Sequence, residues 1–329
     1  MREIMFKGNR GASLRTLQRV EWQLSRLRME PAQIKLAQMK SNQKRAFYAL
    51  RSGFSSIYGK LKGHDVEKFT TPLWENFDAE LEMVFLPDPP FSFLRNKIIR
   101  DTMFVAVGGN WQNKELAFLE EKISRNELKF LLQEDYVGEP ILSNSEYLTS
   151  HNTIHHMYHF ARFLARTRCD LDQIGRVVEW GGGYGNMAKI FKRLKPKPST
   201  YIIIDTPLFS CIQWIYLATI FGEENVHLIE NCEDDIRAEK INLVPLCFLD
   251  CHAICSELFI STWALSESSR YSQDYVVDHE WFDSKHILVA YQNSSKTLPD
   301  ADRVGKFAKN IGAVTENIDF LPANQYAFL

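Results

Sequence analysis

The stretch that decides the fold is Val177-Val-Glu-Trp-Gly-Gly-Gly-Tyr-Gly185, a short apolar run that ends in an acid and is followed by alternating glycines. A second apolar run, Tyr201 to Ile204, ends in Asp205 twenty residues further on. This order predicts a strand, a glycine loop, a helix and a second strand, the arrangement with which a parallel α/β sheet binds a nucleoside-containing ligand. Glycine is needed where the backbone turns sharply and a Cβ atom would collide. Asp205 is expected at the carboxyl end of the second strand, where it can accept hydrogen bonds from ribose hydroxyls.

The spacing of the glycines distinguishes between cofactors. Dinucleotide sites use G-x-G-x-x-G, and starting that pattern at Gly181 puts Asn186 where the third glycine belongs. The pattern Glu-x-Gly-x-Gly-x-Gly fits residues 179–185 without a mismatch, and it resembles motif I of class I S-adenosylmethionine-dependent methyltransferases. The acid before the first glycine suits an amino-acid ammonium and would repel a pyrophosphate. We therefore expect S-adenosylmethionine, with a nicotinamide or flavin cofactor and a purely structural loop as alternatives. The expected cofactor-binding residues are Glu179, Gly181, Gly182, Gly183, Gly185, Asp205, Thr206 and Ser261.

The rest of the C-terminal half predicts further strands and helices in alternation. A helix is expected from Pro207 to Phe221, and two segments compete for the place of the third strand. A closing hairpin is typical of the class I methyltransferase fold, whereas dinucleotide folds usually add a sixth parallel strand. We predict an α/β, Rossmann-like class I methyltransferase with a seven-stranded sheet and a mainly helical N-terminal domain. The later expected elements are strands at 226–229 or 241–244, 258–260 and 286–291, a helix at about 301–310, and hairpin strands at 314–320 and 325–329.

Charge divides the chain unevenly. Residues 1–62 contain 14 Lys and Arg and 3 acids, so this segment carries +11 and the remainder −13 within a net charge of −2. Leucines and a valine at helical spacing between residues 14 and 27, and a second candidate helix at 33–48, predict that the segment is helical. It is either a solvated face of a helical cap or a surface for a polyanion, which could be an anionic membrane, an acidic glycan or nucleic acid. We divide the chain into this segment, a cap or acceptor-side domain at 63–151, and a methyltransferase domain at 152–329.

The sequence contains no run of 18 apolar residues and no secretory signal, so a cytoplasmic protein is expected. The six cysteines lie in the C-terminal half and include no C-x-x-C pair, which predicts neither a disulfide framework nor a metal site. Cys247, Cys251 and Cys255 recur every four residues and are expected to be small packing residues on one face of a helix.

Two N-terminal features bear on the acceptor. Asp88-Pro-Pro-Phe91 imitates the loop with which amino-methyltransferases hold a flipped base, but a complete sheet follows Gly185 without it, so a simple turn is favoured. A helix is predicted from Thr153 to about Arg168, capped by Asn152 or Thr153. His155 and His159 are expected on its polar side. A histidine of this helix could remove a proton from an acceptor hydroxyl.

A set of short segments between Phe93 and the C-terminus carries a resemblance to a known family: 134–140, 152–159, 179–185, 204–207, 243–245 and 261–267. On these segments, the chain from about Phe93 onward resembles the sugar O-methyltransferase family of bacterial glycan gene clusters. One segment departs from the family pattern, because Ser261-Thr-Trp-Ala-Leu-Ser-Glu-Ser268 retains only Glu267 where we expect an opening Asn and a Ser-x-x-Glu-Met ending.

The resemblance implies methyl transfer from S-adenosylmethionine to a sugar hydroxyl in surface-glycan biosynthesis. The candidate bases are His155, His156 and Glu267, and Tyr291 and Asn293 are expected to bind the acceptor at the carboxyl edge of the sheet. The expected partner is a saccharide or lipid-linked glycan, with peripheral contact between residues 1–62 and the inner membrane face and no nucleic acid. The alternatives are another methyl acceptor (a metabolite, RNA or protein), a nicotinamide-dependent oxidoreductase, or a protein that binds the cofactor without catalysis.

Overall fold

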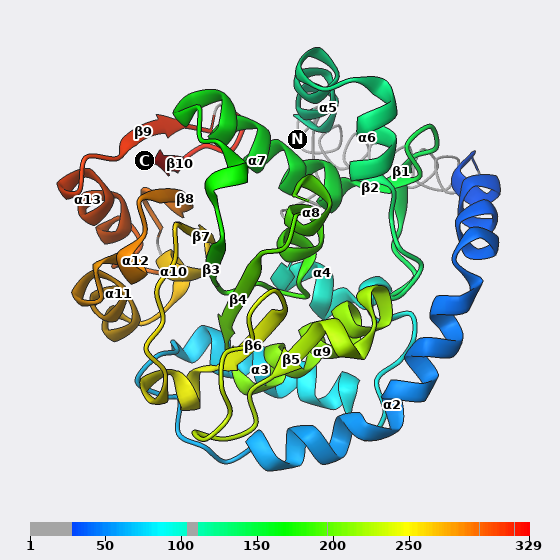
Figure 1. The fold of residues 1–329 in the computed structure, drawn as a ribbon, viewed down its shortest axis with the longest axis horizontal. Helices are drawn as coiled ribbons and strands as arrows, with labels where there is room; N and C mark the ends of the chain where they lie inside the picture. Colours follow the sequence, from blue (N-terminus) through cyan, green and yellow to red (C-terminus); the bar gives the residue numbers. More distant parts are fainter. Residues whose placement is uncertain (1–27, 104–110, 196, 296, 319) are drawn as a thin grey trace, which may run out of the picture.

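The computed structural model describes residues 28–103, 111–195, 197–295, 297–318 and 320–329 (Figure 1). Its centre is an eight-stranded sheet with the order β5-β6-β4-β3-β7-β8-β10-β9, in which β10 alone runs antiparallel to its neighbours. The strands are β3 (Arg176–Trp180), β4 (Thr200–Asp205), β5 (Val226–Leu228), β6 (Ile241–Pro245), β7 (Leu258–Thr262), β8 (His286–Gln292), β9 (Val314–Asn317) and β10 (Asn324–Phe328). A separate two-stranded sheet consists of β1 (Leu142–Asn144) and β2 (Thr149–Ser150).

The central strands are buried along almost their whole length, and every residue of β4 and β6 is buried. Parallel strands covered by helices on both faces favour continuous apolar runs such as Tyr201 to Ile204. Right-handed crossovers place α8 (Asn186–Leu194) and α9 (Pro207–Phe221) on one face. They place α10 (Ala264–Glu267) and α11 (Arg270–Asp278) on the opposite face.

The remaining helical elements surround this sheet and continue through the N-terminal half. They are residues 28–39, α2 (Ser41–Leu61), α3 (Pro72–Phe85), η1 (Phe93–Arg95), α4 (Lys97–Met103), α5 (Trp111–Lys122), α6 (Arg125–Leu132), α7 (His151–Thr167), η2 (Leu171–Gln173), η3 (Glu223–Asn225), η4 (Leu246–Cys251), α12 (Glu280–Asp283) and α13 (Arg303–Asn310).

The predicted Rossmann-like class I methyltransferase fold is confirmed, with one difference in the number of strands. We expected Val226–Ile229 and Ile241–Val244 to compete for one position, but both join the sheet as β5 and β6. β5 pairs over three residues at the edge of the sheet, outside β6. The closing hairpin is present as predicted, because β10 lies between β8 and β9.

The described part of the basic N-terminal segment packs onto the body of the protein. Helix α2 runs along α9 (Figure 1), and Phe47, Phe54 and Tyr58 bury their rings in the same hydrophobic core as the sheet. The predicted helix at 33–48 is interrupted at Lys40, after which α2 continues to Leu61. The predicted helix at 14–27 lies outside the described residues.

Several basic side chains of this segment form ion pairs with acidic side chains of the rest of the chain. Part of the positive charge of residues 1–62 is therefore balanced by negative charge on the remainder. Four ion pairs of this kind are formed among the described residues: Lys40–Asp135, Arg51–Asp88, Lys60–Glu230 and Lys62–Glu82. Phe91, from the proline-rich loop, is buried and packs edge-on against the ring of Phe47. Among the described residues, no helix is both long and apolar enough to cross a membrane.

The cysteine prediction was wrong in two respects. The structure joins Cys232 and Cys251 in a disulfide, although their spacing gave no such indication. Cys247, Cys251 and Cys255 do not form a buried face, since Cys255 is exposed and η4 ends at Cys251. No group of three or more potential metal ligands occurs in the part of the chain that the structure describes.

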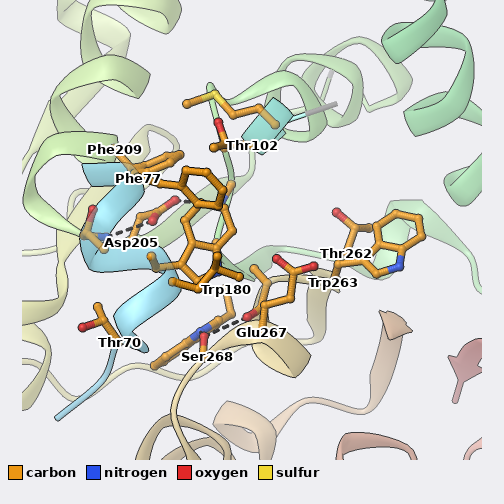
Figure 2. A pocket seen from close by; sticks show the side chains of 18 of the residues that line it. Thr70, Phe77, Thr102, Trp180, Asp205, Phe209, Thr262, Trp263, Glu267 and Ser268 are labelled. Atoms are coloured by element: carbon orange, nitrogen blue, oxygen red, sulfur yellow. Dashed lines mark hydrogen bonds between the residues drawn. The ribbon is translucent and has the colours of Figure 1, made fainter. Parts of the chain in front are cut away.

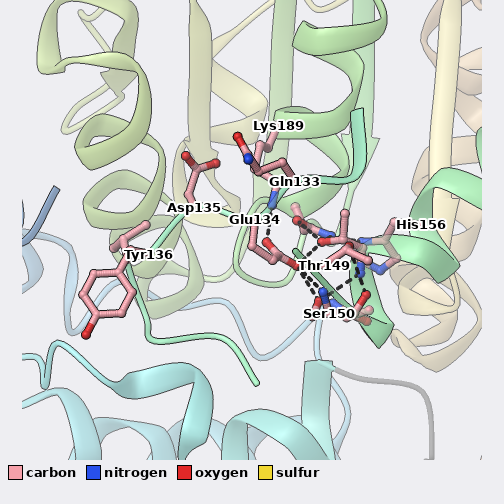
Figure 3. A network of polar contacts seen from close by, with 12 residues as sticks. Gln133, Glu134, Asp135, Tyr136, Thr149, Ser150, His156 and Lys189 are labelled. Atoms are coloured by element: carbon pink, nitrogen blue, oxygen red, sulfur yellow. Dashed lines mark hydrogen bonds and ion pairs between the residues drawn. The ribbon is translucent and has the colours of Figure 1, made fainter. Parts of the chain in front are cut away.

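A buried ion pair connects the loop after α6 to the sheet domain (Figure 3). Lys189 of α8 donates to Glu134 Oε2 at 2.8 Å, and both side chains are almost fully buried. The other carboxylate oxygen of Glu134 accepts hydrogen bonds from the Ser150 and Thr153 hydroxyls at 2.5 Å each. Ser150, rather than Asn152 or Thr153, is also the N-cap of α7. The network therefore holds the start of α7 against α8, beside the glycine loop.

We predict that Lys189→Met destabilises the protein by about 3–5 kcal/mol, because it leaves Glu134 buried without a cationic partner. Urea unfolding followed by circular dichroism measures the change. The matched control is Lys97→Met, which removes an exposed i,i+4 pair with Asp101 and is expected to cost less than about 1 kcal/mol. Equal effects of the two changes would contradict a structural role for the buried pair.

Candidate functional site

A cavity of about 560 Å³ lies at the carboxyl ends of β3, β4 and β7, where ligands bind in open α/β sheets (Figure 2). The glycine loop and the ends of three strands form its floor, and α3 and the end of α4 contribute to its wall. The lining residues include Thr70, Leu73, Trp74, Phe77, Met103, His156, Glu179, Trp180, Gly181, Gly182, Gly183, Asp205, Thr206, Phe209, Thr262, Trp263, Glu267 and Gln292.

The glycine loop is shaped by close protein contacts and by its backbone conformation. Gly181 has φ +74°, and a Cβ placed on it would lie 2.0 Å from the Cβ of Ala264. Gly183 has φ +55°, and a Cβ placed on it would make ordinary van der Waals contact with the Met103 side chain, 3.8 Å away. Positive φ values of this kind favour glycine over any residue with a side chain. The loop thus needs glycine at Gly181 because of the close approach of α10, and at Gly183 because of its backbone conformation.

Asp205 fixes this loop to the end of the neighbouring strand. Its Oδ2 accepts hydrogen bonds from the Gly182 amide at 2.9 Å and the Gln213 side chain at 2.7 Å, and its Oδ1 accepts one from the Thr206 amide at 2.9 Å. Burial raises the pKa of Asp205 to about 7, and these hydrogen bonds oppose the shift. The carboxyl group therefore positions the loop in addition to lining the cavity.

Glu179 lies at the end of β3 and is almost fully buried beneath the loop. Tyr201 donates a hydrogen bond to its Oε2 at 2.9 Å. Burial raises the pKa of Glu179 to about 8, opposed by this hydrogen bond and reinforced by the charge of Asp205. The residue lines the cavity at a point where an ammonium group would restore its ionised form.

Glu267 and Gln292 form the polar pair on the opposite side of the cavity. The Gln292 side chain donates to Glu267 Oε1 at 3.0 Å, which leaves the second carboxylate oxygen of Glu267 outside this bond. Burial raises the pKa of Glu267, while the Gln292 amide and the Trp74 indole oppose the shift. Glu267 is half-buried and lines the cavity beside Trp180 (Figure 2).

His156 also lines the cavity, and its neighbours fix the tautomer of its ring. The Thr153 hydroxyl donates its proton to Glu134. Its oxygen can therefore only accept a hydrogen bond from the side-chain amide nitrogen of Asn186, which lies 3.3 Å away. That same nitrogen lies 2.9 Å from His156 Nδ1, which must then be the unprotonated ring nitrogen. Burial, followed by the charges of His155 and Lys189, lowers the pKa of His156 to about 3. The neutral ring carries its proton on Nε2 and is better suited to donate a hydrogen bond than to remove a proton.

His155, predicted as a candidate base, does not line the cavity. It is fully buried, with Nδ1 2.5 Å from Glu115 Oε1 of α5. Burial raises the pKa of Glu115 to about 9 and lowers that of His155 to about 3, so a neutral acid faces a neutral imidazole at pH 7. His159 is likewise buried, beside Tyr326, so the predicted polar side of α7 is covered.

Four other predicted residues also lie away from the cavity lining. The Ser261 hydroxyl is buried and accepts a hydrogen bond from the Leu265 amide of α10, and Gly185 packs against Leu217. Tyr291 is buried with its hydroxyl on Gln325, and Asn293 is exposed. Successive side chains of a strand point to opposite faces, so Gln292, between these two, is the residue that reaches the cavity.

Sequence reasoning missed the contribution of α3 and of Trp263. Trp263 has φ +68°, stacks on His155 with ring centroids 5.6 Å apart, and donates from Nε1 to Asn324 at 2.6 Å. A non-glycine residue with positive φ directly after a strand is uncommon and often belongs to a functional site. Its position after β7 was predictable, but its backbone conformation was not.

Comparisons with known proteins give fold-level likenesses only. No family profile matches the sequence, and no curated protein sequence matches it. Among solved structures, the chain is similar to PigF with SAH (12% identity, 51% of this chain and 60% of that chain, TM-score 0.34). It is also similar to an O-methyltransferase family protein from Burkholderia thailandensis (12% identity, 90% and 96%, TM-score 0.34) and to human N-acetylserotonin methyltransferase with SAM (11%, 71% and 74%, TM-score 0.31).

We predict that Gly181→Ala destabilises the protein by about 2–4 kcal/mol, from overpacking against Ala264 and from the left-handed backbone. The double variant Gly181→Ala/Ala264→Gly should recover part of this loss, because it removes the clash but not the positive φ. Urea unfolding of the two variants and of Ala264→Gly alone measures the coupling. A double variant no more stable than Gly181→Ala would show that the close approach at Ala264 is unimportant.

Proposed function

We propose that this chain is an S-adenosylmethionine-dependent O-methyltransferase that acts on a sugar hydroxyl in surface-glycan biosynthesis. The observation that carries the proposal is that one cavity contains both halves of such a site. Glu179, the glycine loop and Asp205 lie along one side, and Glu267 with Gln292 lies on the other.

The residues present fit an adenosyl cofactor. Gly181, Gly182 and Gly183 line the cavity with backbone alone, and Asp205 can exchange hydrogen bonds with ribose hydroxyls at the end of β4. Glu179 supplies a buried carboxyl group that suits an ammonium and disfavours a pyrophosphate. When bound, S-adenosylmethionine supplies a methyl group activated by its sulfonium. The chain itself has to hold the acceptor, exclude water and take up one proton.

Glu267 is the proposed general base. Its carboxylate would take up the proton of the acceptor hydroxyl, and Gln292 fixes the orientation of the carboxylate. His156 Nε2–H is proposed to donate a hydrogen bond to the acceptor. Positioning supplies much of the rate in a displacement of this kind.

A sugar acceptor is supported by the combination of polar groups and indole rings around Glu267. Trp74, Trp180 and Trp263 line the same cavity as Gln292 and Thr262, and aromatic faces beside amide and hydroxyl groups suit a saccharide ring. The alternative is a methyltransferase for another small acceptor, which would share the cofactor side and differ around Glu267. A nicotinamide-dependent oxidoreductase is disfavoured by Glu179.

We predict that adenosylhomocysteine raises the thermal unfolding midpoint and that NAD and NADP do not. A ligand present at 100 times its Kd stabilises the native state by about 2.7 kcal/mol, which shifts the midpoint by a few degrees. Differential scanning fluorimetry with the three ligands at equal concentration measures the effect. Stabilisation by NAD alone would overturn the proposed cofactor.

We predict that Glu267→Gln lowers kcat for methyl transfer by about 10²–10⁴-fold and leaves the Kd for adenosylhomocysteine within twofold of wild type. In the wild type, the rate should fall as the pH drops through the pKa of Glu267, because only its ionised form accepts a proton. That pKa lies above the ordinary glutamate value, so the decline begins at a higher pH than an exposed glutamate would give.

Initial rates with a panel of bacterial surface saccharides, and calorimetry for the cofactor, provide these measurements. Glu80→Gln, an exposed change on α3, is the matched control and should leave both quantities unchanged. A Glu267→Gln enzyme with wild-type kcat would assign the base elsewhere.

A further inference from the structure

The first two described helices carry more positive charge than their contacts with the rest of the chain use. Residues 28–62 contain eight Lys and Arg and a single acid, Glu30. Four of the eight form the ion pairs with the body of the protein described above. The other four are exposed and form no ion pair with any described residue: Arg28, Lys35, Lys44 and Arg45. Their charges are therefore available to a negatively charged partner.

The helix at 28–39 has one buried and one exposed side. Ala32 and Leu36 are buried in a small apolar cluster with Leu142 and Leu148. The opposite side of the helix faces solvent and mixes basic with apolar residues: Arg28, Ile34, Lys35 and Met39.

Helix α2 continues this arrangement after the interruption at Lys40. Its inner side is fixed to the body, because the Gln43 side chain donates to Asp135 Oδ1 at 2.7 Å. The helix at 28–39 rests on the same segment, since the Gln33 side chain donates to the Pro140 carbonyl at 2.9 Å. The outer sides of both helices therefore point away from residues 135–148, and both helices lie along the edge of the molecule, in dark blue in Figure 1.

Large apolar side chains are exposed among the four basic residues. Ile34, Met39 and Tyr48 are 53%, 50% and 45% exposed. Tyr48 lies beside Lys44, because its ring stacks on that of Phe91 with centroids 6.1 Å apart and Lys44 Nζ lies 5.8 Å from the same centroid. Single exposed apolar residues are common, but a group of them among unpaired cations is typical of an interaction surface. We call these four basic and three apolar side chains the basic face.

We propose that the basic face docks the protein on an anionic lipid bilayer. Lipid phosphates supply the negative charge that the four cations lack, and the boundary between headgroups and acyl chains takes up exposed aliphatic and tyrosine side chains. A nucleic acid would match the charges, but its phosphate backbone offers no apolar region to Ile34 and Met39. The inference goes beyond the proposed function and does not depend on it, because no residue of the basic face lines the cavity.

Sedimentation of the full chain with lipid vesicles tests the proposal. The chain should bind vesicles of equimolar phosphatidylglycerol and phosphatidylcholine much more tightly than pure phosphatidylcholine, and salt should weaken the binding. Lys44→Gln/Arg45→Gln should weaken it by about tenfold or more, since each basic residue near an anionic surface contributes about fivefold. Ile34→Ser/Met39→Ser should weaken it by about tenfold without reducing its dependence on salt.

Lys306→Gln/Lys309→Gln is the matched control, because it removes the same charge from exposed positions of α13, on the far side of the molecule in Figure 1. It should bind within about twofold of wild type, and thermal unfolding verifies that every variant is folded. Two outcomes would overturn the inference: a wild type that ignores anionic vesicles but binds a duplex oligonucleotide, or basic-face variants that bind the vesicles as wild type does. The second outcome would assign the contact to another part of the chain.

Discussion

The carboxyl group of Asp205 is the constraint on which the site depends. It sits at the end of β4 and accepts hydrogen bonds from the glycine loop after β3, from the first residue beyond β4 and from Gln213 of α9. Because three segments converge on one buried acid, the loop is held by hydrogen bonds from both of its neighbouring elements. The Gln213 side chain also donates to the Gly183 carbonyl at 3.0 Å, so α9 supports the loop directly. This side of the cavity is therefore held together by hydrogen bonds among the glycine loop, the end of β4 and α9.

The other side of the cavity depends on contacts that are distant in sequence. Glu267 comes from the helix after β7, Gln292 from the end of β8 and Trp74 from the N-terminal region. The buried Glu134–Lys189 pair holds the histidine-bearing helix α7 against α8, which begins directly after the glycine loop. The N-terminal region therefore contributes side chains both to the hydrophobic core and to the wall of the cavity.

The sequence allowed the sheet domain to be predicted well, because each strand is a compact apolar run and helix α9 begins at Pro207 and ends before Gly222. Side-chain placement was harder. Tyr291 and Asn293 were expected to bind the acceptor, but strand parity brings Gln292 to the cavity instead. The sequence places His155 on the polar side of α7, but α5 covers this position and the Glu115 carboxyl group lies within hydrogen-bonding distance of the His155 ring. Neither the contact of α3 with the cavity nor the eighth strand could be predicted, because both arise from tertiary packing rather than local pattern.

The central claim is that one cavity binds an adenosyl cofactor through Asp205 and the glycine loop and presents it to Glu267. The most direct measurement is a crystal structure of the full chain with adenosylhomocysteine. The account predicts ribose hydroxyls on Asp205, the amino-acid part toward Glu179, and the sulfur atom on the side of the cavity that faces Glu267. A ligand bound outside this cavity, or one whose sulfur lies away from Glu267, would contradict it.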